Sequence, residues 1–187
     1  IHGDRSFQTE YVYSIFGNGD VLIDTRVTPQ GPFYKTLPRL GLTMALNKTL
    51  DRVQWYGKGP GEQYPDTCLA GKIGRWEATV DELYTPYVMP QENGNRMDVR
   101  WLAMGNARGE GLMAVGMPTM NFSAHWYTAQ QMEVAEHQHE LVKNDFITLN
   151  LDYAHCGVGT ATCGPATFEP YWLKPQPFSF GVLLRPF

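Results

Sequence analysis

Apolar and polar side chains alternate along much of the chain, and a period of two residues predicts β-strands. In residues 7–16, aromatic and aliphatic side chains fall on one face of such a strand and polar side chains on the other. Residues 17–20 (Gly-Asn-Gly-Asp) tolerate positive φ angles, and the alternation resumes over residues 21–27. These two runs predict a β-hairpin.

The same alternation returns four more times along the chain. It covers residues 40–46, 53–55, 146–152 and 178–184. Most of the 19 Gly and 13 Pro residues lie between such runs, where they interrupt strand ladders and form turns. The pattern therefore predicts an all-β, antiparallel protein with sandwich-like layers.

One segment predicts a helix. Thr128 is a suitable N-cap, and Gln131 follows it by three residues, as in a capping box. Residues 130–136 favour helix, so we expect about two turns here.

The glycine run at residues 57–61 (Gly-Lys-Gly-Pro-Gly) resembles a phosphate-binding loop only superficially. Pro60 removes a backbone donor, and the strand–turn–helix context of such loops is missing. We interpret this run as a turn.

Composition excludes several classes of protein. The 187 residues fit one domain, and 43% of them are hydrophobic, which is enough for a core. The net charge of −4 gives no basic field for nucleic acid, and no apolar stretch is long enough for a membrane span. We therefore expect a globular protein that binds neither nucleic acid nor membranes.

The three cysteines, Cys68, Cys156 and Cys163, do not form a disulfide framework, because their number is odd and their spacing is wide. We expect reduced thiols and a cytoplasmic location. The chain begins Ile-His-Gly-Asp-Arg without an initiator Met, so we expect a piece of a longer protein.

One cluster carries metal-ligating residue types. His137 and His139 lie among three glutamates, at positions 133, 136 and 140. No single strand or helix geometry brings all of them together, so a solvated end of the predicted helix is the alternative to a metal site. We favour the solvated end and predict no metal in this chain.

Three loops combine Gly, Pro, aromatic and polar residues, at residues 55–66, 84–96 and 155–165. Aromatic faces stack on sugars, and carboxylates, amides and guanidinium groups bind hydroxyls. The alternative interpretation is structural, with the polar side chains of these loops satisfying buried backbone groups. Four residues are candidates for that role: Glu62, Asp66, Glu92 and Arg96.

These loops also carry a family resemblance. Three motifs carry it: residues 55–66, the Pro-Gln-Glu-Asn-Gly-Asn-Arg run at 90–96, and Leu-Asn-Leu-Asp at 149–152. They resemble the C-terminal domain of bacterial family 2 β-galactosidases. This part is also called the small chain, or domain 5. The three motifs match in order and spacing, and the resemblance extends along the whole chain.

The resemblance implies an antiparallel β-supersandwich related to galactose mutarotases, with at most one or two short helices. It also implies that residues 1–187 form a single domain that is roughly the C-terminal two-thirds of the family's domain. An isolated piece of this kind would expose unpaired strand edges, and we expect it to need its missing neighbours or to self-associate.

The family reaction implied by the resemblance is retaining hydrolysis of terminal β-D-galactosides such as lactose. Its two glutamates, and the magnesium beside them, belong to a separate (β/α)₈ barrel in the parent enzyme. The present sequence lacks alternating β/α elements, so we expect no catalytic residue and no cofactor in this chain. The expected partners are the remaining domains of a bacterial cytoplasmic β-galactosidase, a homo-oligomer that binds the galactoside.

In the family, a loop of this domain places a Trp against the sugar. Here Cys163 or Gly164 stands at that point, and a thiol offers no stacking surface. We name Cys163, Gly164 and His155 as candidate residues that line the substrate pocket, with a buried structural role as the alternative for His155.

A second class of function is a free-standing carbohydrate-binding or mutarotase-like sandwich. It requires His125 or His155 to face a carboxylate in an open cleft.

Overall fold

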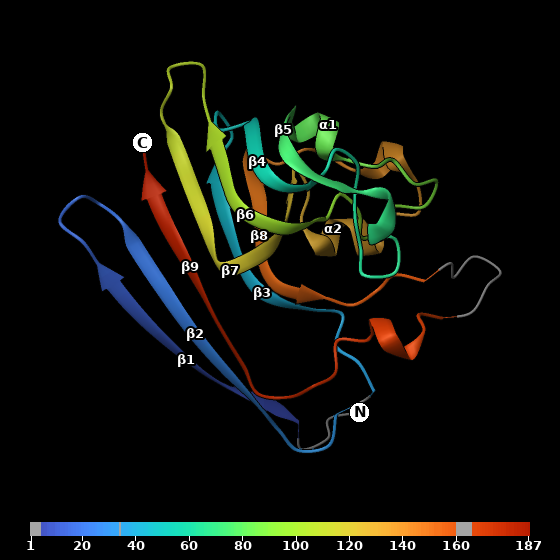
Figure 1. Ribbon diagram of the computed structural model, residues 1–187. Helices are drawn as coiled ribbons and strands as arrows, with labels where there is room; N and C mark the ends of the chain where they lie inside the picture. Colours follow the sequence, from blue (N-terminus) through green and yellow to red (C-terminus); the bar gives the residue numbers. More distant parts are fainter. Residues whose placement is uncertain (1–4, 34, 160–165) are drawn as a thin grey trace.

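A computed structural model describes residues 5–33, 35–159 and 166–187 of the chain. Within these residues the protein is an antiparallel all-β structure with sandwich-like layers, as predicted (Figure 1). The strands are β1 (Ser6–Ile15), β2 (Val21–Gln30), β3 (Arg39–Asn47), β4 (Arg52–Gly59), β5 (Lys72–Thr79), β6 (Arg96–Gly105), β7 (Gly111–His125), β8 (Phe146–His155) and β9 (Phe178–Pro186).

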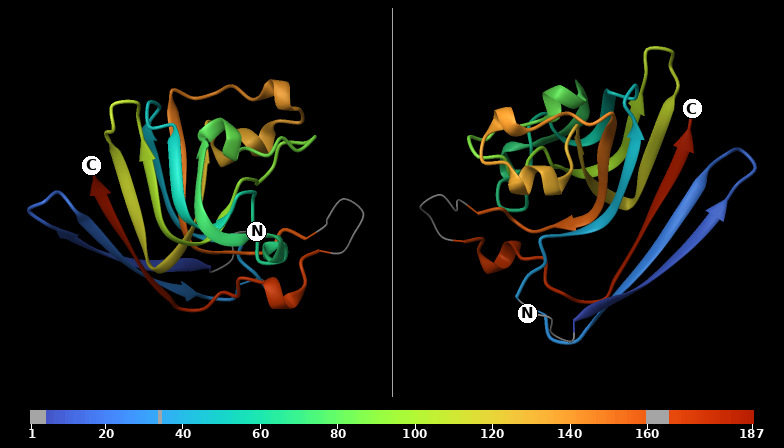
Figure 2. Two further views of the ribbon diagram at one scale, coloured as in Figure 1. Left: turned by 45° about the horizontal axis from the view of Figure 1, so that its top comes forward. Right: turned by 180° about the vertical axis from the view of Figure 1, so that it is seen from behind.

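The sheet forks at β7. Its path runs β1-β2-β9-β7-β6-β4-β5, and β8 joins β7 as well, with β3 beside β8. Residues 112–117 of β7 pair with β9, whereas residues 121–125 pair with β8. The two branches therefore leave the same edge of one long strand and diverge, as Figures 1 and 2 show.

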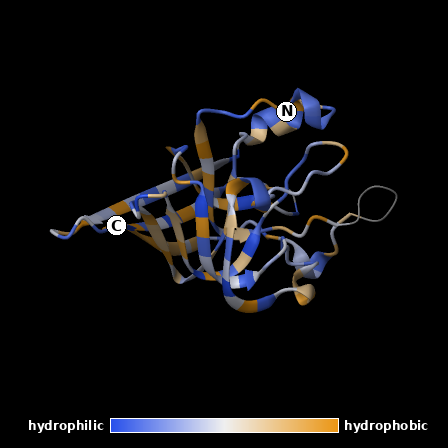
Figure 3. Cartoon of the chain, turned by 90° about the horizontal axis from the view of Figure 1, so that it is seen from above, coloured by the Kyte–Doolittle hydropathy of each residue, from blue (hydrophilic) through white to orange (hydrophobic). Residues whose placement is uncertain are grey.

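The main core lies where β4, β6, β7 and β8 meet. Alternate positions of each strand point into it, as in the pair Val53 and Trp55 of β4, and Trp55 packs edge-on against Phe122 of β7 with ring centroids 5.7 Å apart. Figure 3 shows the corresponding alternation of hydrophobic and hydrophilic residues along the strands. The period of two in the sequence thus reflects one buried face per strand.

Strand β1 departs from this rule. It pairs with β2 over all ten residues, but nearly every one of its side chains is exposed. Tyr13 and Ile15 on one face are 59% and 78% exposed, and Val12 on the other is 47% exposed. The predicted hairpin is confirmed, yet apart from Phe33, whose ring contacts that of Phe7, the described residues leave both faces of its first strand exposed.

Two short α-helices are present in the described residues. Helix α2 (Ala129–Val134) begins at the predicted capping box of Thr128 and Gln131. Helix α1 (Val80–Leu83) was not predicted, although Thr79 and Glu82 form the same kind of box. Three 3₁₀ turns complete the elements: η1 (Cys68–Ala70), η2 (Gln138–Glu140) and η3 (Glu169–Tyr171).

The predicted turn at the glycine run is wrong for its first half, because Gly57 and Gly59 lie in β4. A Cβ atom on Gly57 would lie 2.8 Å from Val99 Cα, and one on Gly59 would lie 2.7 Å from Trp76 Cδ1. Glycine is needed here for close packing between strands and not for a turn.

Cys68 and Cys156 are free thiols, and Cys163 lies outside the described residues. Across the described ranges, none of the helices has the length and apolar character to cross a membrane.

Candidate functional site

The three loops singled out by the sequence meet at one end of the molecule, away from the turn of the β1–β2 hairpin (Figure 1). Loop A (residues 60–71) connects β4 to β5, and loop B (84–95) connects α1 to β6. Loop C, described over residues 156–159, follows β8.

Glu62 of loop A binds loop B. The amide of Gly94 donates to Glu62 Oε2 over 2.7 Å, and the hydroxyl of Tyr87 donates to the other carboxylate oxygen. Arg96 closes the same junction, because its Nε donates to the carbonyl of Pro60 (3.0 Å) and its Nη1 to the carbonyl of Gly94 (2.7 Å). Burial lowers the pKa of Arg96 to about 10, which still leaves it charged at neutral pH.

Asp66 of loop A binds loop C. The amides of Val158 and Gly159 donate to its two carboxylate oxygens, over 3.1 and 2.6 Å. A Cβ atom on Gly157 would lie 2.8 Å from Asp66 Cγ, so the carboxylate needs glycine beside it. The backbone-satisfying role predicted for Glu62, Asp66 and Arg96 is therefore confirmed.

Glu92 has a different role from the one predicted. Arg39 Nη1 donates to its Oε2 over 3.0 Å, and the hydroxyl of Tyr64 donates to its Oε1 over 3.4 Å. His155 Nε2 lies 3.6 Å from the same Oε1. Glu92 thus binds three side chains from separate elements instead of backbone amides.

Arg39 also forms an ion pair with Asp152, whose side chain is almost fully buried. Arg39 begins β3, and Asp152 lies on the neighbouring strand β8 opposite Gly41. A Cβ atom on Gly41 would lie 2.5 Å from Asp152 Cα, so glycine makes room for this pair. We call Arg39, Tyr64, Glu92, Asp152 and His155 the ionic cluster.

Hydroxyl and amide groups continue the ionic cluster along the sheet. Asn150 Nδ2 donates to Ser123 Oγ (3.0 Å), and Thr43 Oγ1 donates to Asn150 Oδ1 (2.8 Å). These residues come from β8, β7 and β3 and share one face of that branch. One face of β8 is therefore apolar and the other polar, and both are buried.

Burial and charges within the cluster together set the protonation of its members. Burial by itself would raise the pKa of Glu92, but the contact with His155 and the charge of Arg39 outweigh it, and the pKa lies below its ordinary value. Burial raises the pKa of Asp152, against the opposing effect of Arg39. Burial and then the charge of Glu92 raise the pKa of Tyr64, which stays protonated and acts as a donor.

Of the three candidate pocket residues, the structure describes only His155. His155 is 8% exposed, its Nδ1 lies 2.7 Å from the carbonyl oxygen of Cys156, and its ring packs edge-on against Tyr64. It is therefore part of the ionic cluster beneath the loops. Cys163 and Gly164 lie outside the described residues.

His125 and His155 do not reproduce the arrangement that a mutarotase-like site requires. His125 is 2% exposed, and its Nε2 lies 3.1 Å from the carbonyl oxygen of Asn93. His155 does face a carboxylate, that of Glu92, but both groups lie within the ionic cluster and Glu92 is already engaged by Arg39.

The histidine cluster after α2 forms a surface turn. His137 Nδ1 lies 3.2 Å from Glu140 Oε1, and both side chains are largely exposed. Over residues 5–33, 35–159 and 166–187, no three His, Cys, Asp or Glu side chains gather in a way that could hold a metal ion.

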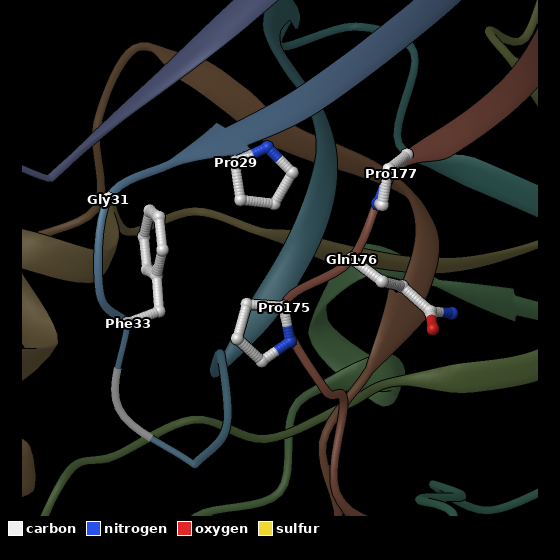
Figure 4. A pocket seen from close by; sticks show the side chains of 6 residues that line it. All are labelled: Pro29, Gly31, Phe33, Pro175, Gln176 and Pro177. Atoms are coloured by element: carbon white, nitrogen blue, oxygen red, sulfur yellow. The ribbon is translucent and has the colours of Figure 1, made fainter.

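A separate hollow lies where the chain leaves β2 and where it enters β9 (Figure 4). Its volume is about 350 Å³. The rings of Phe33, Pro29 and Pro175 face one another, while the amide of Gln176 points away from them. It contains no member of the ionic cluster and no charged side chain.

Comparison with known proteins decides the family. Residues 2–184 match the model of the beta galactosidase small chain family. The chain belongs to this family.

Individual β-galactosidases align along most of the chain. That of Vibrio cholerae serotype O1 is 38% identical over 181 residues, which is 96% of this chain and 17% of that protein. That of Aeromonas hydrophila is 37% identical over 87% of this chain and 15% of that protein, and that of Pseudoalteromonas haloplanktis is 32% identical over 98% and 17%. The small-chain sequence thus spans 15–17% of the length of these relatives.

Sequence reasoning missed three members of the small chain's ionic cluster: Arg39, Tyr64 and Asp152. A weak signal was present for Asp152, because it ends an alternating strand run, and a charged residue that becomes buried in a strand needs a partner. Its partner Arg39 lies 113 positions away, and no local pattern links the two.

Proposed function

We propose that this chain is the non-catalytic C-terminal domain of a β-galactosidase, an enzyme that hydrolyses terminal β-D-galactosides such as lactose. In this proposal residues 1–187 form one domain that completes the wall of the active site and contacts between subunits. The family match over residues 2–184, combined with coverage of only 15–17% of the relatives, carries the proposal.

The chemistry of the ionic cluster supports a non-catalytic role. Retaining glycosidases need one carboxylate as nucleophile and one protonated carboxyl group as acid, about 5–5.5 Å apart. Glu92 and Asp152 instead share the guanidinium of Arg39, and the lowered pKa of Glu92 disfavours the protonated form that an acid requires. The pKa of Asp152 is raised, but its side chain is almost fully buried and so cannot reach a sugar. We therefore assign both catalytic glutamates, and the magnesium expected beside them, to the rest of the parent enzyme.

The contacts between the loops, together with the ionic cluster, suit a domain that supplies a rigid wall. Glu62 and Asp66 tie loop A to loops B and C, and Glu92 ties loop B to strands β3 and β8. Charge-assisted hydrogen bonds of this kind hold loops in one arrangement. Substrate contact by Cys163 or Gly164, a homo-oligomeric parent and a bacterial cytoplasmic location remain predictions.

A chimaera tests the proposal. The matched segment of the Vibrio cholerae enzyme is replaced by this chain, and hydrolysis of a chromogenic β-galactoside is measured beside the same enzyme truncated before that segment. We expect an active chimaera, an inactive truncated enzyme and no turnover by this chain alone. The intact mass of the isolated chain is measured first, to verify that only these 187 residues are present. Turnover by the 21.1 kDa chain alone would overturn the non-catalytic assignment, and a chimaera that folds with a cooperative melt but is inactive would overturn the proposed completion of the active-site wall.

A further inference from the structure

Loop B exposes a short apolar tip. Val88 is 91% exposed and Met89 is 58% exposed, with Tyr87 beside them at 39%. The base of the same loop is buried, since Asn93 and Asn95 are inaccessible to solvent. The exposed apolar side chains are therefore confined to the tip, which we define as Tyr87, Val88 and Met89.

The tip is held on both sides by hydrogen bonds. The carbonyl of Tyr87 accepts from the side-chain amide of Gln138, and its hydroxyl donates to Glu62. The carbonyl of Met89 accepts from Gln91 Nε2 over 3.2 Å. A loop fixed in this way loses little conformational entropy when a partner covers it.

Further bonds fix the base of loop B. Asn93 Oδ1 accepts from the amide of Thr85 (3.0 Å), and Asn93 Nδ2 donates to the carbonyl of Gln91 (2.9 Å). These bonds join the two ends of the loop across the tip. The tip is thus a preorganised apolar projection.

The adjoining loops add apolar surface to the same end of the molecule. Leu69 of loop A is 99% exposed, and Val158 of loop C is 38% exposed. Glu62 and Asp66 tie these loops to one another, and Figures 1 and 2 show loops A and B projecting at the end away from the β1–β2 hairpin. Exposed apolar side chains thus occur on all three loops at this end of the molecule.

We infer that the tip of loop B docks into an apolar hollow on the remaining part of the same β-galactosidase polypeptide. This inference rests on the proposed function, and it names one surface through which this domain contacts the rest of the enzyme. The length of the relatives indicates which partner covers the tip. About five-sixths of their chain lies outside the matched segment. That part belongs to the same polypeptide, so it is present at a fixed one-to-one ratio and at high effective concentration.

The test replaces both apolar side chains of the tip, as V88S together with M89S, in the chimaera with the Vibrio cholerae enzyme. We expect the rate of thermal inactivation of β-galactoside hydrolysis to rise about tenfold, as for the loss of one central interface residue. The melting temperature of the 187-residue chain alone should stay unchanged, because both side chains are already exposed there.

Val134→Ser is the matched control, since Val134 is 78% exposed but lies in α2 outside the three loops. An active chimaera whose inactivation rate is unchanged by V88S/M89S, or raised equally by V134S, would overturn the inference alone. A wild-type chimaera that folds with a cooperative melt but is inactive would overturn the proposed function and the inference with it. Loss of self-association of the isolated chain in V88S/M89S, with the chimaera unaffected, would assign the tip to a second copy instead.

Discussion

Glu92 connects loop B to Arg39 of β3 and His155 of β8, so its charge is the first to test. Glu92→Gln keeps the size of the side chain but removes the charge that faces Arg39 and His155. We expect the free energy of unfolding in urea at pH 7 to fall by about 2 kcal/mol, a usual value for hydrogen bonds to a charged group.

The control for this substitution is Glu133→Gln, at an exposed position of α2. Exposed substitutions of this kind change stability by less than about 0.5 kcal/mol. Equal effects of the two substitutions would show that the ionic cluster contributes nothing specific to stability.

His125 makes a separate prediction about pH. Burial lowers its pKa below the ordinary value near 6.5, partly opposed by the charge of Glu92. Its Nδ1 has no hydrogen-bond partner among the described residues, so a proton there would be a buried, unsatisfied donor. The folded state therefore favours the neutral ring.

The sign of the effect follows from proton binding. Below pH 6.5 the unfolded chain binds a proton at His125 that the folded chain does not, so stability falls as the pH falls, by at most about 1.4 kcal/mol per pH unit. We expect urea unfolding between pH 7.5 and 5.5 to show this loss in the wild type and less of it in His125→Gln, which retains an amide donor for Asn93. Identical slopes would contradict the assignment.

Two glycines of the run at residues 57–61 test whether glycine is needed there for packing between strands. Gly57→Ala places a Cβ atom 2.8 Å from the backbone of Val99, so β4 and β6 must shift apart. Overpacking of this kind costs about 1–3 kcal/mol. Gly61 has no atom within 4 Å of such a Cβ, so Gly61→Ala is a control in the same run. Thermal melts of both variants measure the difference, and equal melting temperatures would support the turn predicted from the sequence.

Elements set by local side-chain order were predictable. The hairpin of β1 and β2, the strands β8 and β9, and helix α2 follow from alternation and from the capping box of Thr128. Helix α1 carried the same signal at Thr79, but its four residues are too short to show a helical period. Gly57 was misread because close packing and turns both require glycine, and only the neighbouring strand distinguishes them.

The candidate site was predictable only in part. The contacts of Glu62, Asp66 and Arg96 followed from the rule that polar groups in tight loops satisfy buried backbone. The ionic cluster could not be derived in this way, because Arg39, Glu92 and Asp152 come from separate elements that meet only when β3 pairs with β8. Local patterns carry no information on such pairing.

The described residues leave one end of the forked sheet, at strand β1, uncovered. Strand β1 is an edge strand with an uninterrupted ten-residue register, and it exposes apolar side chains on both faces. Natural edge strands are usually protected by charges, bulges, proline or a covering layer. Glu10 is the one charged side chain within β1, so its protection is weak.

The isolated chain should therefore self-associate through this hairpin. We expect light scattering to show species larger than the 21.1 kDa monomer. Val12→Lys together with Ile15→Lys should shift the population toward monomer, because charge on each face opposes both edge pairing and face-to-face stacking. Val142→Lys, at a position 72% exposed after η2, is the control for added charge alone. A wild-type chain that is a monodisperse monomer with a cooperative melt would contradict this prediction. It would show that the branch formed by β9, β2 and β1 is stable without a covering layer, with the faces of β1 exposed to water.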